Sequence, residues 1–141
     1  MFGQEVRQLM HGEPLLTAAP HTDVHEAACR MAGSRASAVV VVDGDRVAGI
    51  FTERDAVLRV IAQGLEPRQT PLSAVMTEHP ETTTPQASLG QALTRMHQLG
   101  IRHLPVVEDG RLVGMVTARD ALDPDLEEFV CEVSRRQGFG G

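Results

Sequence analysis

The amino-acid sequence predicts an α/β fold made of two tandem β-α-β-β-α repeats. Of its 141 residues, 42% are hydrophobic, which is enough to form a core. The two halves of the sequence are also similar to each other. A shift of 65 residues aligns 17–57 with 82–122 without a gap, and 13 of these 41 aligned positions are identical. Self-similarity at a fixed period indicates a duplicated structural unit.

Each repeat is expected to begin with a short threonine-rich strand, 15–18 or 81–83, followed by a helix. After Pro20 and Pro85, apolar residues recur at helical spacing, which predicts a helix with one buried face. Asp23 and Ser88 precede the apolar positions and are the expected N-caps. The apolar positions are Val24, Ala27, Ala28 and Met31 in the first repeat and Leu89, Ala92, Leu93 and Met96 in the second.

A β-hairpin and a second helix complete each repeat. Two apolar runs in each repeat, 39–42 with 47–51 and 104–107 with 112–116, flank a short acidic segment that contains glycine. Such a pattern is typical of a hairpin. The second helix is expected to begin at Thr52 in the first repeat and at Thr117 in the second.

The expected domain boundaries follow the repeats. Residues 1–62 form the first repeat, 63–71 are a linker rich in glycine and proline, and 72–122 form the second repeat. Residues 123–141 are predicted to hold a C-terminal amphipathic helix, which Asp123 caps and which Pro124 begins. Its apolar stripe, Leu126, Phe129, Val130 and Val133, is expected to dock on its own domain or on a partner subunit.

The composition argues against several classes of function. All 13 basic residues are arginine, so a catalytic Schiff-base lysine and a phosphate-loop lysine are excluded. The net charge of −6 and the lack of a basic tract argue against nucleic-acid binding. No apolar run is long enough to cross a membrane, no signal peptide is evident, and two cysteines are too few for a disulfide framework. We therefore expect a cytoplasmic protein with no membrane or nucleic-acid partner, and the absence of a catalytic constellation argues against an enzyme.

Two matching segments carry a resemblance to a known family. Gly49-Ile50-Phe51-Thr52-Glu53-Arg54-Asp55 and Gly114-Met115-Val116-Thr117-Ala118-Arg119-Asp120 share a Thr-x-x-Asp signature at constant spacing. They resemble the CBS domain, which usually occurs in tandem pairs called Bateman modules. Residues 100–107 resemble the second-strand region of that family, and the likeness extends from about Val6 to Leu122.

The resemblance implies a pseudo-twofold pair of repeats that forms a homodimer and binds an adenine nucleotide such as AMP, ADP or ATP. The nucleotide would be a regulatory ligand, with no cofactor required and an unidentified protein target. By position, Asp55 and Asp120 would hold ribose, while Thr52 with Arg54 and Thr117 with Arg119 would hold phosphate. Thr17 and residues 82–85, among them Thr82 and Thr84, would border the clefts. His103 would contact phosphate or base, and its counterpart in the first repeat is Ala38.

The signature residues also have a structural interpretation. A threonine before a helix caps it, and an aspartate three residues later can bond back to the threonine amide. Arg54 and Arg119 stand in the first helical turn, where a cation opposes the helix dipole, so they indicate either an anion site or a surface ion pair. A ligand-free dimerisation or interaction scaffold is therefore the alternative function.

A metal-based or thiol-based redox protein is the third hypothesis. His21, His25 and Cys29 are spaced four residues apart, and Cys131 is a second thiol. However, three ligands leave a structural zinc site incomplete, and His21 is expected to precede the helix. The sequence leaves open which adenosyl ligand binds, which cleft is occupied, whether the dimer is parallel or antiparallel, and what the downstream target is.

Overall fold

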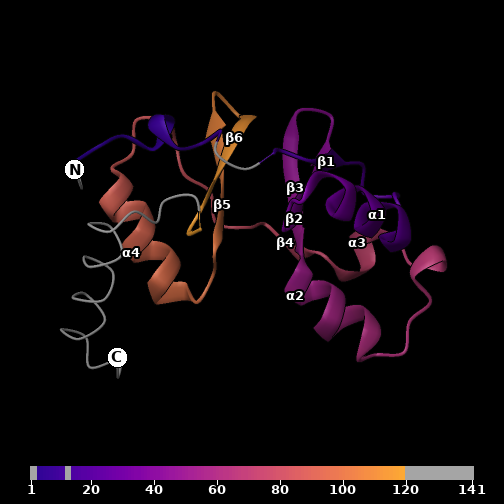
Figure 1. Cartoon of the computed structure of the whole chain (residues 1–141). Helices are drawn as coiled ribbons and strands as arrows, with labels where there is room; N and C mark the ends of the chain where they lie inside the picture. Colours follow the sequence, from indigo (N-terminus) through magenta and orange to yellow (C-terminus); the bar gives the residue numbers. More distant parts are fainter. Residues whose placement is uncertain (1–2, 12–13, 120–141) are drawn as a thin grey trace, which may run out of the picture. The chain divides into compact units, whose positions relative to one another are not determined.

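The computed structural model describes residues 3–11 and 14–119, and it confirms the α/β fold (Figure 1). The described residues form two compact units. Unit 1 comprises residues 3–11, 82–108 and 114–119, and unit 2 comprises residues 14–81 and 109–113. The predicted C-terminal helix, 123–141, lies outside the described residues.

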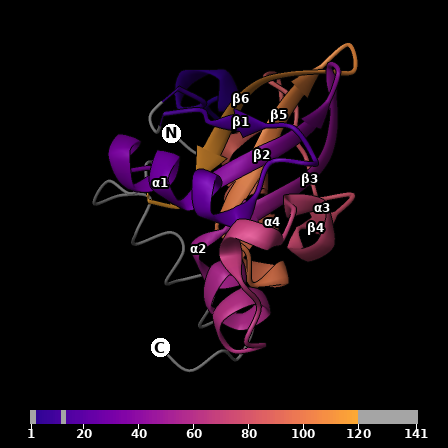
Figure 2. The ribbon, with the colours of Figure 1, turned by 90° about the vertical axis from the view of Figure 1, so that its right-hand side faces the viewer.

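Unit 2 contains a four-stranded sheet in the order β1-β2-β3-β4, most of which faces the viewer in Figure 2. β1 (Thr17–Ala18) runs parallel to β2 (Ala38–Asp43). β2 and β3 (Arg46–Thr52) form the predicted antiparallel hairpin, and β4 (Thr77–Glu78) pairs with the far edge of β3. β1 is shorter than the strand expected over 15–18, and β4 was not expected from the sequence.

The helices of unit 2 begin where the sequence places their caps. α1 (Val24–Ser34) is capped by Asp23, whose carboxylate accepts a hydrogen bond of 2.8 Å from the Glu26 amide. The second helix begins after Thr52, as expected. It consists of α2 (Glu53–Asp55) and continues into η2 (Ala56–Ile61), whose turns are wider than those of an α-helix. Two short helical segments follow, η3 (Pro67–Gln69) and α3 (Leu72–Val75).

The core of unit 2 joins the sheet to helices on both sides of the predicted linker. Val39 and Val41 lie on one face of β2 and share this core with Phe51 of β3. Leu72 of α3, which belongs to the second repeat by sequence, is fully buried in the same core. Segment 70–78 is therefore part of the fold of the first repeat. The remaining core residues are Ala18, Val24, Ala27, Met31, Val60 and Val75.

Unit 1 holds the corresponding elements of the second repeat. α4 (Leu89–Leu99) is capped by Ser88, which accepts a hydrogen bond of 3.4 Å from the Gln91 amide. The predicted hairpin is formed by β5 (His103–Glu108) and β6 (Arg111–Thr117), and residues 111–113 of β6 group with unit 2. Near the N-terminus, η1 (Val6–Gln8) adds one short turn to unit 1.

The strand predicted over 81–83 is reduced to a single bridge between Thr83 and Val106. In the first repeat, the Val40 amide donates to the Leu16 carbonyl at 2.9 Å, and this bond extends the pairing. The corresponding position in the second repeat is Pro105, which has no amide hydrogen to donate. Proline thus shortens the strand pairing in the second repeat.

The segment that precedes each repeat packs on the other repeat. Residues 4–10 lie on the second repeat, where the Gln4 carbonyl accepts from the Leu89 amide at 2.7 Å. Residues 70–78 lie on the first repeat, where the Thr70 carbonyl accepts from the Val24 amide at 2.9 Å. The compact units therefore cut across the repeats of the sequence.

A glycine in each hairpin permits this close packing. A Cβ atom on Gly49 would lie 2.5 Å from the Met76 sulfur, and one on Gly114 would lie 2.9 Å from the Met10 carbonyl oxygen. Both distances are too short for a real Cβ contact. A larger residue would therefore push away residues 4–10 and 70–78, which we call the exchanged segments because each packs on the other repeat.

Among the described residues, no helix is both long and apolar enough to span a lipid bilayer.

Candidate ligand-binding site

Three of the residues predicted to form the first ligand site meet at one edge of the four-stranded sheet. Ala38, which is fully buried at the start of β2, pairs with Thr52 at the end of β3. Thr17 begins β1 and pairs with Val40, and it is half-buried. Arg30 of α1 donates a hydrogen bond of 2.7 Å to the Thr17 carbonyl and so fixes the start of β1. The structure therefore brings Thr17, Ala38 and Thr52 to the same edge, where α2 begins.

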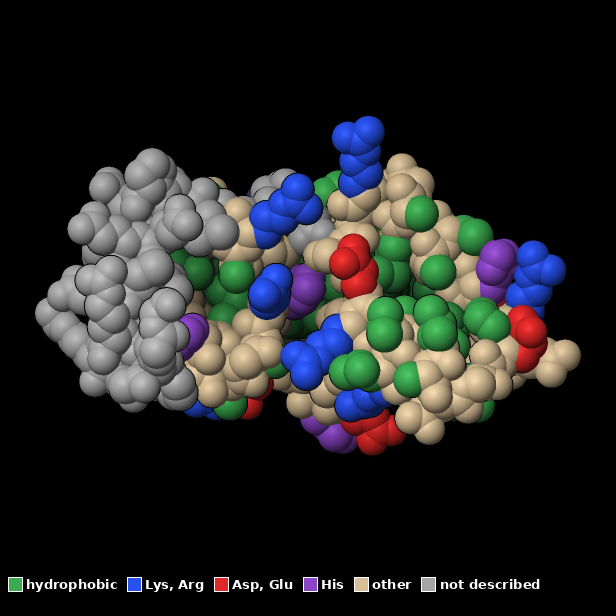
Figure 3. Space-filling view, turned by 60° about the horizontal axis from the view of Figure 1, so that its bottom comes forward, with side chains coloured by type: hydrophobic (Ala, Val, Ile, Leu, Met, Phe, Trp, Pro, Cys, Tyr) green, Lys and Arg blue, Asp and Glu red, His purple; other side chains and the backbone are tan. Residues whose placement is uncertain are grey.

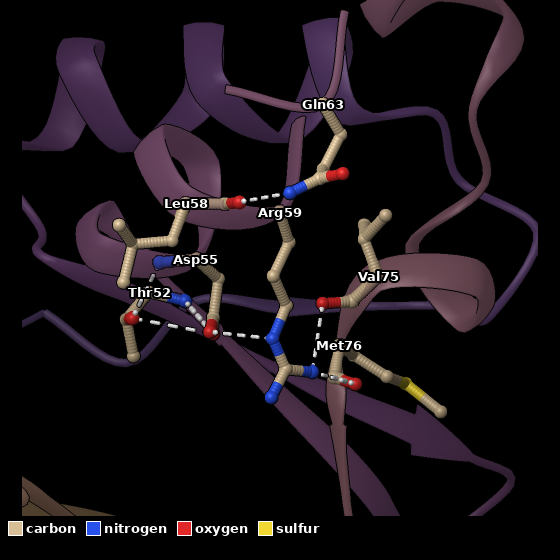
Figure 4. Close-up of polar contacts among 7 residues, drawn as sticks. All are labelled: Thr52, Asp55, Leu58, Arg59, Gln63, Val75 and Met76. Carbon is tan, nitrogen blue, oxygen red and sulfur yellow. Dashed lines mark hydrogen bonds and ion pairs between the residues drawn. The ribbon is translucent and has the colours of Figure 1, made fainter. Parts of the chain in front are cut away.

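Thr52 and Asp55 form a reciprocal cap at this edge (Figure 4). Oδ2 of Asp55 accepts from the Thr52 amide at 2.9 Å and from the Thr52 hydroxyl at 3.2 Å. The Asp55 amide in turn donates to the Thr52 hydroxyl oxygen at 3.2 Å. The capping interpretation of the first signature is thereby confirmed, while a ligand role for either side chain remains a prediction.

Arg59 is part of this arrangement, and the sequence analysis missed it. Its Nε lies 3.6 Å from Oδ1 of Asp55, one helical turn away. Its Nη1 donates to the carbonyl of Met76 at 3.0 Å and to that of Val75 at 3.4 Å. The spacing of four residues between an aspartate and an arginine on a predicted helix was the available signal. The two carbonyls lie in the exchanged segment and carry no such signal.

Arg54 has a different environment from Arg59. It is exposed in the first turn of α2, and its side chain makes no hydrogen bond or ion pair with any described residue. The surface ion pair considered for Arg54 is therefore absent from this part of the chain. Its guanidinium group is exposed at the start of a helix that also carries Glu53 and Asp55.

The second repeat positions its signature in a similar way. The Ala118 amide donates to the Arg102 carbonyl at 3.0 Å, as the Glu53 amide donates to the Ser37 carbonyl at 3.1 Å. These bonds connect the residue after each signature threonine with the residue before the first strand of its hairpin. Of the predicted residues, Thr117 is buried, His103 is half-buried, and Thr82, Thr84 and Arg119 are exposed. Asp120 lies outside the described residues.

The histidine and cysteine residues of the redox hypothesis are only partly brought together. The Cys29 sulfur lies 3.6 Å from Nε2 of His25 on α1, and Arg68 lies 3.3 Å from the same nitrogen. His21 precedes α1, as expected. Among the described residues, no group of three or more His, Cys, Asp or Glu side chains is arranged to hold a metal ion. Cys131 lies outside these residues.

Comparison with known proteins identifies the repeats. The model of the CBS domain family matches residues 6–62 and 72–126. The CBS domain-containing protein YhcV of Bacillus subtilis is 38% identical over 104 residues, which cover 74% of each protein. The chain spans about a fifth of the length of several Arabidopsis thaliana relatives, such as 19% of the CBS domain-containing protein CBSCBSPB2.

Solved structures agree with this assignment. An uncharacterized conserved protein from Pyrococcus horikoshii superposes with a TM-score of 0.78 at 31% identity, and 96% of each chain is covered. The CBS domain pair of protein MJ0100, in complex with 5′-methylthioadenosine and S-adenosyl-L-methionine, gives a TM-score of 0.75 at 25% identity over 83% of this chain and 95% of that one. The two signatures, the repeated hairpins and these matches show that the chain belongs to the CBS domain family.

Proposed function

We propose that this chain is a regulatory module that binds an adenine nucleotide or a related adenosyl ligand. The observation that carries the proposal is the duplicated Thr-x-Arg-Asp signature, whose first copy stands at the start of α2 beside the sheet edge. The MJ0100 pair, which contains two adenosyl compounds, supports this ligand class. The proposed role is regulatory rather than catalytic.

The proposed ligand contacts divide by chemistry. Arg54 and Arg119 bind phosphate, which suits Arg54 because its exposed guanidinium is not paired within the described residues. Asp55 and Asp120 accept hydrogen bonds from the ribose hydroxyls. Thr52 and Thr117 add amide and hydroxyl groups at the start of the helix, where anions are favoured. Thr17, Thr82 and Thr84 border the clefts, and His103 contacts phosphate or base at the position where the first repeat has Ala38.

We further propose that the chain acts as a homodimer. Apolar side chains on and after η2 are exposed, with exposed fractions of 54% for Val57, 49% for Leu58 and 71% for Ile61. Hydrophobic side chains lie open on the face of the molecule seen in Figure 3. A second copy would remove this surface from water, and Leu65, 41% exposed, would extend it. A ligand that favours one arrangement of the dimer would pass a signal to a protein target through its differential affinity.

The ligand is tested first on the purified protein. Because the chain has no tryptophan or tyrosine, a purine band in its ultraviolet spectrum would reveal a co-purified ligand, and mass spectrometry would identify it. Isothermal titration with AMP, ADP, ATP and S-adenosylmethionine follows, with Asp120→Asn as the variant expected to lose binding. Unchanged affinity in Asp120→Asn would contradict the proposed ribose contact.

A ligand-free scaffold is the competing function, and one observation favours it. Thr52 and Asp55 already satisfy each other as a helix cap, so this signature has a structural use without any ligand. The scaffold predicts that none of these ligands raises the melting temperature. The dimer is tested separately by light scattering. Ile61→Glu, which places a charge on the exposed apolar surface, is expected to yield monomers, with Arg46→Glu on an exposed strand end as its control.

A further inference from the structure

Three side chains of unit 2 form a polar cluster at α1, and none of them belongs to the candidate ligand site. The Cys29 sulfur lies 3.6 Å from Nε2 of His25, and Nη2 of Arg68 lies 3.3 Å from the same nitrogen. Cys29 is exposed, and His25 precedes it by one helical turn. A cysteine beside a histidine is activated as a nucleophile, because the imidazole can take the thiol proton. The cluster thus combines an exposed thiol with a base and a cation.

The fold of unit 2 holds Arg68 against α1. Thr70 is buried, and its carbonyl accepts a hydrogen bond of 2.9 Å from the Val24 amide in the first turn of α1. The Thr70 hydroxyl donates to the Glu66 carbonyl at 2.8 Å, which closes the short turn that contains Arg68. The guanidinium therefore approaches His25 from a segment that is hydrogen-bonded to the start of the same helix.

The contact with Arg68 assigns the protonation of the imidazole. A guanidinium group only donates hydrogen bonds, so Nε2 of His25 is the acceptor in this contact. A neutral imidazole that accepts at Nε2 carries its hydrogen on Nδ1. The nitrogen that faces the Cys29 sulfur is therefore the basic one. The positive charge of Arg68 lies against this nitrogen, and a nearby cation favours the thiolate over the thiol.

We propose that Cys29 is a modification site that forms a mixed disulfide with a low-molecular-weight disulfide, and that His25 takes its proton. The Cys29 sulfur attacks one sulfur of the reagent while Nε2 of His25 receives the thiol proton. A new S–S bond forms and the S–S bond of the reagent breaks. The second sulfur of the reagent leaves with the electron pair and then takes the proton from His25. Cys29 is thereby oxidised, and the reagent is reduced to one thiol.

This inference goes beyond the proposed nucleotide function, since it uses no residue of the two signatures. The partner sulfur comes from another molecule, because the described part of the chain contains no second cysteine. The exposed position of Cys29 on the surface of a helix leaves room for a small reagent.

The rate at which the full chain reacts with dipyridyl disulfide tests the proposal, because the released pyridinethione is followed by its absorbance. The measurements use Cys131→Ser, so that Cys29 is the one reacting thiol. We expect Cys29 to react faster in the folded protein than in the urea-unfolded protein. His25→Ala should lower the rate of the folded protein by about tenfold. Arg68→Met, which removes the cation, should lower it by about two- to fivefold.

Two matched controls separate activation by His25 from simple exposure. His21→Ala removes an exposed histidine that precedes α1, and it should leave the rate unchanged. Ala32→Cys, combined with Cys29→Ser, places a thiol at an exposed position of the same helix with no histidine one turn before it. This thiol should react no faster than the unfolded protein. Circular dichroism shows whether each variant is folded. An equal rate for His25→Ala and its parent, or an equal rate for the two thiol positions, would overturn the proposal.

Mass spectrometry of the chain with both cysteines present identifies the product. After incubation with oxidised glutathione, we expect the peptide that contains Cys29 to carry glutathione in a bond that dithiothreitol reverses. A disulfide between Cys29 and Cys131, or a Cys29 peptide without glutathione, would contradict the modification site.

Discussion

The two repeats can be compared residue by residue, because equivalent positions differ by 65 in number. α1 ends at Arg35, which adopts a left-handed conformation with φ of 55°, whereas α4 ends at Gly100 with φ of 67°. β1 extends its pairing through the Val40 amide, whereas Pro105 stops the same pairing in the second repeat. The backbone path is thus retained where the side chains have diverged.

The comparison teaches that the duplicated backbone tolerates unequal side chains at its turns and strand ends. The features that the repeats share are those that the packing requires. A glycine faces an exchanged segment in both hairpins, and the amide after each signature threonine donates to the residue before the first hairpin strand. Substitutions at equivalent positions of the two repeats can therefore show which side-chain differences change the stability of the protein and which change only ligand binding.

The largest expected loss of stability comes from the exchanged segments. Leu72→Ala removes a fully buried side chain from the core of unit 2 and should lower the free energy of unfolding by about 2–5 kcal/mol. Val6→Ala at the equivalent place in unit 1 removes a smaller buried side chain and should cost about 1.5–3 kcal/mol. Urea unfolding followed by circular dichroism measures both. Exposed Ser73→Ala is the control, and equal values for Leu72→Ala and Ser73→Ala would contradict the exchanged packing.

The hairpin glycines should give the next largest effect. Gly49→Ala places a methyl group 2.9 Å from the Thr77 carbonyl oxygen, so it should destabilise the protein by about 1–3 kcal/mol. Gly114→Ala meets the Met10 carbonyl at the same distance and should cost a similar amount. Gly33→Ala in α1 meets no atom within 4 Å and should stabilise the helix by about 0.5–1 kcal/mol. Thermal unfolding checks this prediction: the melting temperature should fall for Gly49→Ala and Gly114→Ala and rise for Gly33→Ala.

The helix ends give a smaller and opposite pair of effects. Gly100→Ala forces a residue with a Cβ into a left-handed conformation and should cost about 1–2 kcal/mol. Arg35→Gly relieves the same strain in α1, and its gain should be smaller because glycine adds freedom to the unfolded chain. Denaturant titration of both variants tests the contrast, and destabilisation by Arg35→Gly would show that the arginine side chain contributes in another way.

The N-caps are expected to give the smallest effects. Asp23→Ala should cost about 1 kcal/mol, because it removes an acceptor 2.8 Å from the Glu26 amide. Ser88→Ala should cost less, since its bond to the Gln91 amide is 3.4 Å long. Asp23→Asn keeps the acceptor and serves as the control. A larger loss for Ser88→Ala than for Asp23→Ala in thermal unfolding would reverse this order.

Much of the fold could be predicted from local patterns. The expected caps and apolar stripes placed the starts of α1 and α4 at their observed positions, and the acidic segments with glycine marked both hairpin turns. Glycine at a turn adopts the positive φ that a hairpin requires, as Gly44 does with φ of 65°. These features depend on neighbours in sequence, so the sequence was sufficient to find them.

The exchanged segments could not be predicted in this way. The alignment shows that Val6 and Leu72 are equivalent when one residue is inserted, but equivalence does not say on which repeat each side chain packs. For the candidate site, the Thr52–Asp55 cap followed from its spacing. The Arg59 contacts with Val75 and Met76 depend on tertiary structure, and local patterns do not contain them.

The exchange of segments has a consequence for the order in which the protein can fold during synthesis. The ribosome releases residues 4–10 before β5 and β6, yet Met10 accepts its hydrogen bond from Met115 of β6. Residues 4–10 therefore have no partner strand or helix to pack on until the second repeat has been synthesised. Unit 2 can assemble most of its core as soon as segment 70–78 emerges, so nascent chains should acquire structure from the middle outward.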